Sequence, residues 1–174
     1  MIGPATALFA ALLAADAAPS AATETQGPPA QSAAPDRLPM RLALQTEGAI
    51  GVYPGDFYNH LVGGRVDLVF SPHVSVGAYL GYANLKGKDG RTSNLLAYAQ
   101  AEYLAGWVGK VRIPLRFATG YLPRNGPVMR LATGFAFPLT PTVDFFTELA
   151  PMVWLTGDQM VVSMDLAAEL AFRF

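Results

Sequence analysis

Apolar residues occupy every second position from Met160 to Phe174. The set is Met160, Val162, Met164, Leu166, Ala168, Leu170, Phe172 and Phe174. The positions between them include Ser163, Asp165, Glu169 and Arg173. A helix would spread these residues around its axis, whereas a strand places alternate residues on opposite faces. The segment is therefore predicted to be a strand with one apolar face and one polar face.

The same two-residue period begins at Met40 and predicts seven further strands. They start near residues 40, 62, 74, 95, 111, 129 and 143. In the first of them, Leu42 and Leu44 share a face, and Arg41 and Gln45 share the other. Residues 40–174 are thus expected to form an all-β domain of eight antiparallel strands, joined in an up-and-down order.

Composition separates a membrane barrel from an ordinary soluble domain. The chain is 52% hydrophobic and only 14% charged, where about 25% charged is usual for soluble domains. It has no run of 18 apolar residues that would span a bilayer as a helix. The net charge of −1 excludes a basic surface for nucleic acid, and the absence of cysteine excludes disulfides and thiolate sites. A sheet can cross a membrane only if it closes on itself, which favours a barrel.

The polar face is predicted to line the interior. It carries many small residues: Ala43, Gly63, Gly77, Gly81, Gly120, Gly134, Ala136, Ala167 and Ala171. A narrow eight-stranded lumen needs such residues, because side chains only just fit inside it. The competing arrangement is a soluble lipocalin-like carrier with its apolar face inward.

Charges on the polar face balance, with seven acids and seven bases when Lys110 is included. The expected luminal charge network is Arg41, Glu47, Arg65, Asp67, Glu102, Arg112, Arg116, Arg130, Asp144, Glu148, Asp165, Glu169 and Arg173. Since an unpaired buried charge is costly, these side chains are expected to pair and plug the lumen.

The first 39 residues have a different composition from the rest. The short apolar block at residues 5–15 precedes Ala15-Asp16-Ala17, which fits a signal cleavage site. Residues 1–17 are thus expected to be a signal peptide; the other interpretation is a short buried helix. Residues 18–39 are rich in Ala and Pro and are expected to be a disordered linker.

Connections are expected to alternate in length. Residues 51–60 and 84–94 are predicted to be long polar loops, and residues 71–73 a tight turn. Pro114 and Pro151 fall inside strands, where proline cannot donate to the ladder, so either can mark a bulge that shifts the facing of later residues. Aromatic residues gather toward the strand ends on the apolar face, as expected at the two membrane interfaces.

This pattern over residues 40–174 resembles the small eight-stranded outer-membrane barrels of Gram-negative bacteria, the OmpA/OmpX-like group. The resemblance implies a bacterial outer-membrane location and contact with outer-membrane lipids and lipopolysaccharide. It also implies that the last strand is read by the barrel-assembly machinery, with Leu170, Phe172 and Phe174 as the assembly signal. A monomer without cofactor or catalytic residues is expected, with a structural or surface-interaction role in the envelope.

Three features carry weaker hypotheses about chemistry. His73-Val74-Ser75 resembles the His-x-Ser of lipid A deacylases, although His73 falls in a turn and no acid lies nearby; a lipid-modifying enzyme is therefore the alternative function. His60 and Asp56 share an expected loop, but two histidines and no cysteine give little support to a metal site. The second expected long loop carries the basic residues Lys86, Lys88 and Arg91, which could contact lipopolysaccharide phosphates or lie in a solvated hairpin loop.

Overall fold

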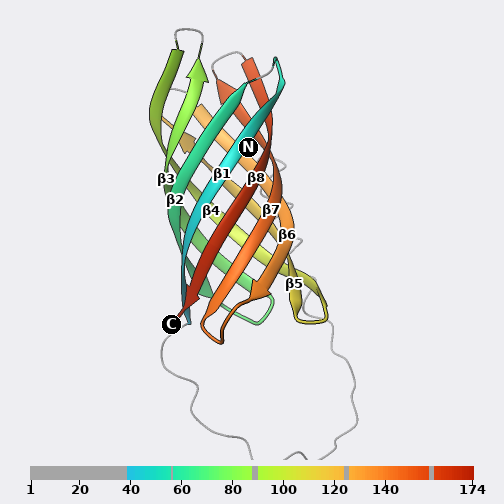
Figure 1. Ribbon diagram of the computed structural model, residues 1–174. Helices are drawn as coiled ribbons and strands as arrows, with labels where there is room; N and C mark the ends of the chain where they lie inside the picture. Colours follow the sequence, from blue (N-terminus) through green and yellow to red (C-terminus); the bar gives the residue numbers. More distant parts are fainter. Residues whose placement is uncertain (1–38, 56, 88–89, 124–125, 157–158) are drawn as a thin grey trace, which may run out of the picture. The chain divides into compact units, whose positions relative to one another are not determined.

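Eight antiparallel strands form a closed barrel. The computed structural model describes residues 39–174, apart from residues 56, 88–89, 124–125 and 157–158. The strands are β1 (Met40–Tyr53), β2 (Tyr58–Val69), β3 (Val74–Gly87), β4 (Gly90–Val108), β5 (Val111–Leu122), β6 (Gly126–Pro138), β7 (Val143–Thr156) and β8 (Gln159–Arg173). Each strand pairs with its neighbours in sequence, and β8 also pairs with β1 (Figure 1). The predicted all-β, eight-stranded, up-and-down barrel is confirmed.

The signal peptide expected at residues 1–17 and the linker expected at residues 18–39 lie outside the described residues, except for Pro39. No helix in the described part of the chain is long and apolar enough to cross a membrane.

The seam between β1 and β8 leaves no open sheet edge. Its register pairs Leu42 with Phe172 and Leu44 with Leu170, and the amide of Phe174 donates to the carbonyl of Met40 over 3.0 Å. Because hydrocarbon offers no hydrogen bonds to an unpaired edge, such closure is a requirement for crossing a membrane.

The outer surface is apolar and the interior is polar over much of the barrel. Leu44, Leu131 and Leu166 are 60%, 55% and 67% exposed on the outside. Arg65 and Arg116 are each only 1% exposed on the inside. This arrangement reverses that of a soluble protein, in which large apolar side chains avoid the surface.

Aromatic side chains lie on the outer surface near both ends of the strands. Tyr53, Tyr58, Tyr82 and Tyr121 are exposed near one end. The exposed aromatic residues toward the other end are Phe70, Tyr103, Trp107, Phe135 and Phe137. Amphipathic rings favour the boundary between hydrocarbon and headgroups, so the two groups mark the two faces of an expected bilayer.

The prediction of long loops at residues 51–60 and 84–94 was wrong, because the strands extend into both segments. β1 continues to Tyr53 and β2 begins at Tyr58, and β3 continues to Gly87 and β4 resumes at Gly90. The strands hold 12 to 19 residues, more than the 9 to 11 or so that a tilted spanning strand requires. Polar residues at the ends of these strands therefore pair in the ladder without needing a loop.

The two prolines interrupt the ladder without shifting the facing of the strands. Pro114 pairs with Leu104 of β4, and Pro151 pairs with Met164 of β8. Neither has a partner on β6, the strand that each faces on its other side. Arg116, Ala150 and Met152 all remain inside. The register shifts lie elsewhere, between Gly51 and Tyr53 in β1 and between Leu104 and Gly106 in β4.

Lys110, which was counted among the luminal charges, lies in the turn between β4 and β5. This turn consists of Gly109 and Lys110, and Gly109 has a φ of 61°, a conformation that glycine adopts at little cost. Lys110 is exposed in this turn, outside the lumen. The described interior positions therefore carry seven acids and six bases, and one acid has no matching base.

Candidate functional site

A first group of ion pairs in the barrel interior surrounds Arg41, near the start of β1. Arg41 donates from Nε to Asp67 and from Nη1 to Glu102, both over 2.8 Å, and from Nη2 to the hydroxyl of Ser75 over 3.1 Å. Asp67 also accepts from Nε of Arg65 over 2.9 Å. Four strands thus contribute to one cluster in which Arg41 has three acceptors.

Arg65 and Arg116 extend this cluster to the opposite wall of the barrel. Nη1 of Arg65 lies 2.8 Å from Glu169, and Nη1 of Arg116 lies 3.1 Å from the same carboxylate oxygen. Arg116 also donates from Nε to Glu102 over 2.6 Å and pairs with Glu148. Because each carboxylate meets two guanidinium groups, charges that would be costly alone are compensated within the lumen.

The network continues through Arg130. Its Nη2 lies 3.0 Å from Glu47 and 3.2 Å from Glu148. Gln45 donates to Glu47 over 2.6 Å. Glu148 therefore links Arg130 to Arg116, so the ion pairs are connected across the barrel.

Phe146 lies among the arginines as an apolar part of the same layer. Its ring centroid is 4.4 Å from the guanidinium carbon of Arg116, 5.5 Å from that of Arg41 and 5.8 Å from that of Arg112. All three distances fall within the range of cation–π contacts. Phe146 was not singled out from the sequence, because its aromatic character gave no sign of a role among charges.

Asp144 pairs with two arginines at the end of the barrel. Arg112 Nη2 and Arg173 Nη2 each lie 2.6 Å from its carboxylate oxygens. Asp144 is fully buried, whereas the side chains of Arg112 and Arg173 are 24% and 43% exposed. These two predicted members of the luminal network therefore lie at its rim.

Asp165 is the one member of the predicted network with no ion pair among the described residues. It is fully buried and accepts a hydrogen bond of 2.6 Å from Ser163 at Oδ1, while Oδ2 has no hydrogen-bond donor. It is also the acid left over when the described interior charges are counted. Sequence spacing did not distinguish it from the other acids.

Two stacked tyrosines lie beyond the charged layer. The rings of Tyr79 and Tyr98 are 4.4 Å apart and only 6° from parallel. Gly63 and Gly81 face the ring of Tyr79, and a Cβ at either position would overlap it. The small residues noted on the polar face thus leave room for a large one.

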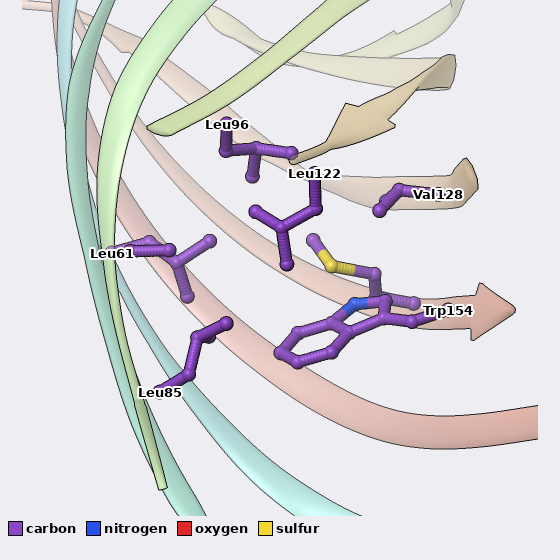
Figure 2. Close-up of a pocket in the computed structure, with 8 residues that line it drawn as sticks. Leu61, Leu85, Leu96, Leu122, Val128 and Trp154 are labelled. Atoms are coloured by element: carbon purple, nitrogen blue, oxygen red, sulfur yellow. The ribbon is translucent and has the colours of Figure 1, made fainter. Parts of the chain in front are cut away.

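The interior becomes apolar toward the strand ends opposite the chain's C-terminus. Figure 2 shows Leu61, Leu85, Leu96, Leu122, Val128 and Trp154 pointing toward one another from the surrounding strands. The space among these side chains has no room for a water molecule. This apolar luminal cluster was missed by the sequence analysis, which treated the inner face as polar throughout.

The residues considered for catalysis or metal binding are not brought together. Ser75 faces the interior beside Arg41, whereas His73 is exposed in the turn before β3, with its ring near Tyr103 and Trp107. His60 is part of β2 and not of a loop, and Asp56 lies outside the described residues. Among the residues that the structure describes, no group of three or more His, Asp or Glu side chains is arranged to hold a metal ion.

The remaining sequence-predicted positions lie at the two ends of the barrel. Leu170 and Phe174 are 41% and 80% exposed, and Phe172 is partly exposed on the same outer face of β8. Lys86 and Arg91 pair across the tip of the β3–β4 hairpin, and Lys88 lies outside the described residues.

Comparisons with known proteins identify the fold. No protein-family model matches the chain, and no curated protein sequence matches it. Among solved structures, Neisserial surface protein A (NspA) matches with a TM-score of 0.59 and 14% identity, over 78% of this chain and 97% of that one. The N-terminal β-barrel domain of Pseudomonas aeruginosa OprF matches with a TM-score of 0.51 and 13% identity, over 78% and 98%.

A de novo designed transmembrane β-barrel is also similar, with a TM-score of 0.50 and 11% identity over 77% of this chain and 95% of that one. Identities this low carry no information on ligand or partner. The matched architecture, the apolar outer surface and the closed β1–β8 seam agree, and this chain has the fold of the small eight-stranded outer-membrane β-barrels.

Proposed function

We propose that the protein is an integral β-barrel of the bacterial outer membrane, with a structural or surface-interaction role in the envelope and a lumen plugged by its own side chains. The observation that carries this proposal is the pairing of an apolar outer surface with an interior of connected ion pairs. An outward apolar face contacts lipid favourably, and eight strands leave a bore that side chains fill.

Two layers support the plugged lumen. One is the charged layer that includes Arg65, Arg116 and Glu169. The other is the apolar luminal cluster around Leu122 and Trp154, which leaves no room for water. Ions crossing the barrel would have to displace ion pairs in the first layer and lose their hydration shell in the second, so conduction is disfavoured.

Planar-bilayer recording tests this proposal directly. Refolded protein, shown by protease protection to be inserted in the bilayer, is expected to give no steady conductance of porin size. A matched preparation of a large porin serves as the positive control. A stable open conductance from the inserted barrel would contradict the plugged lumen, while leaving membrane insertion intact.

A lipid-modifying enzyme is the alternative function, and its test is separate. The separation of His73 from the hydroxyl of Ser75 favours the non-enzymatic role. Mass spectrometry of lipid A from strains with and without the gene is expected to show the same acyl chains. A shift in acylation that requires this gene would contradict the proposal.

The same proposal covers assembly and partners. Leu170, Phe172 and Phe174 form an outward apolar row on β8, and we assign to this row recognition by the barrel-assembly machinery. Outer-membrane lipids and lipopolysaccharide are the proposed surroundings of a monomer, since the exposed apolar side chains are spread around the whole barrel.

A further inference from the structure

A groove of about 320 Å³ interrupts the apolar outer surface across β2, β1, β8 and β7. Its floor includes the small residues Gly48 and Ala168, and its sides include Tyr58 and Leu166. Gly48 pairs with His60 on one side and with Leu166 on the other. The short side chain of Ala168 thus leaves the depression, and the ring of Tyr58 lies against Gly48 beside it.

The polar side chains of Thr46, Tyr58, His60 and Thr147 line this groove, on a surface that otherwise meets lipid. The hydroxyl of Thr46 lies 3.0 Å from Nε2 of His60, and both residues are exposed. In either tautomer of His60 this hydrogen bond leaves one further donor on the pair, the other ring N–H or the threonine hydroxyl. In hydrocarbon an unsatisfied polar group is costly, so a ligand that offers a hydrogen-bonding atom at this point would be stabilised.

The depth of the His60–Thr46 pair in the bilayer indicates which ligand atom would hydrogen-bond to it. Tyr58 belongs to the aromatic group near one end of the strands, and His60 follows it by two residues on the same face. With a rise of about 3.3 Å per residue and a tilt of about 40°, His60 lies roughly 5 Å deeper than Tyr58. Tyrosines mark the headgroup boundary, so this depth suits the ester or amide carbonyl that joins a headgroup to its acyl chain.

We propose that the groove seats one acylated lipid, whose carbonyl hydrogen-bonds the His60–Thr46 pair and whose acyl chain lies over Ala168, beside the ring of Tyr58. The ring of Tyr58 covers Gly48 and limits the groove there, since its hydroxyl is only 3.3 Å from the point that a Cβ of Gly48 would occupy. Thr147 pairs with Ala168 and extends the floor on β7. The inference rests on the proposed insertion in the outer membrane and adds a specific lipid contact to it.

Native mass spectrometry of the barrel released from detergent micelles tests the lipid contact. The probes are dipalmitoyl phosphatidylethanolamine, which has ester carbonyls, and its dihexadecyl ether analogue, which has none. Wild-type barrel is expected to bind the ester lipid about fivefold more tightly, the effect of one hydrogen bond. The double variant Thr46→Val/His60→Phe removes both donors and should bring the two lipids to equal affinity. Thr119→Val/His73→Phe, at exposed residues of β5 and of the turn before β3, should keep the preference.

A second pair of variants tests the groove itself. Ala168→Phe fills the floor from the outside and should lower ester-lipid binding at least tenfold. Ala99→Phe makes the same change at an exposed alanine of β4, four strands away, and should leave binding unchanged. Both substitutions point outward, so folding is checked by the gel mobility of the unheated barrel.

The outcomes separate the lipid contact from membrane insertion. Equal binding of ester and ether lipids by the wild type, or full binding by Ala168→Phe, would overturn the lipid contact while the inserted barrel stands. A dimer that carries no lipid and is lost in Ala168→Phe would also overturn it, and would make the groove a protein interface. A barrel that stays monodisperse without detergent and binds neither lipid would overturn the proposed insertion as well.

Discussion

The guanidinium carbon of Arg116 lies 4.4 Å from the ring centroid of Phe146, inside the barrel and away from solvent. Arg41 and Arg112 approach the same ring at 5.5 and 5.8 Å. Six arginine side chains and seven acids meet in and at the rim of this lumen. The ring face, which carries partial negative charge, therefore adds to the carboxylates in compensating the arginines.

Replacing Phe146 with leucine removes this ring face while keeping an apolar side chain. We expect Phe146→Leu to lower the free energy of unfolding by about 2 kcal/mol, from lost packing and cation–π contact. Urea unfolding of the barrel in detergent micelles measures the change. Phe135→Leu, on the outer surface, is the control and should cost less than about 1 kcal/mol. Equal losses for the two variants would contradict the role of Phe146 among the arginines.

Two isosteric changes compare a paired acid with an unpaired one. Glu169 lies between Arg65 and Arg116, at 2.8 and 3.1 Å, and Glu169→Gln would leave excess positive charge buried. We expect a loss of about 3 to 5 kcal/mol. Asp165 has no ion pair among the described residues, so Asp165→Asn should cost less than about 1 kcal/mol or stabilise the barrel. The same unfolding measurement decides, and a larger loss for Asp165→Asn would show that Asp165 has a partner cation.

Adjacent glycines give a test of interior packing. Gly63 faces Tyr79, and a Cβ there would lie 2.6 Å from the Cα of Gly81. Gly63→Ala is therefore expected to destabilise the barrel by about 1 to 3 kcal/mol. Gly64 faces outward, and its nearest contact would be an ordinary 3.4 Å from the carbonyl oxygen of Ala43. Gly64→Ala should change stability little; thermal unfolding in micelles distinguishes the two, and matching effects would refute the facing of β2.

A charge on the outer surface tests the expected bilayer position. Leu131 is 55% exposed in the middle of β6, where an arginine would enter hydrocarbon. Leu131→Arg is expected to cost about 2 to 4 kcal/mol for barrels refolded into lipid vesicles. Val108→Arg, beside the β4–β5 turn, should cost about 0 to 1 kcal/mol. Similar small losses at both sites would mean that β6 does not face hydrocarbon.

The sequence predicted the strands and their facing wherever polar and apolar residues alternate. Arg65 and Asp67 were assigned to the interior because Val66 and Leu68 flank them with the opposite character. Pro114 and Pro151 left that assignment intact, since each loses pairing with β6 only and keeps its other partner strand. A local pattern was sufficient here because facing in a strand is decided by neighbouring residues.

The apolar part of the lumen could not be predicted in the same way. Leu95 and Leu96 are consecutive and both apolar, and Tyr121 and Leu122 are both largely apolar. Where both faces of a strand are apolar, polar and apolar residues no longer alternate, so the sequence does not show which face points inward. Which ion pairs form was also outside the reach of sequence, because Arg65 and Glu169 are far apart in the chain. The position of Lys110 depended on where the β4–β5 turn falls, which is set by pairing between the two strands.

The neighbouring leucines of β4 allow the apolar luminal cluster to be tested by one matched pair. Leu96 is 1% exposed and packs against Leu122 and Trp154, whereas Leu95 is 52% exposed on the outer surface. Leu96→Ala would leave a cavity that the surrounding strands cannot fill, at a cost of about 2 to 5 kcal/mol. Leu95→Ala should cost about 1 kcal/mol or less, because lipid chains occupy the space. Urea unfolding in vesicles measures both, and a larger loss for Leu95→Ala would mean that β4 turns its other face to the lumen.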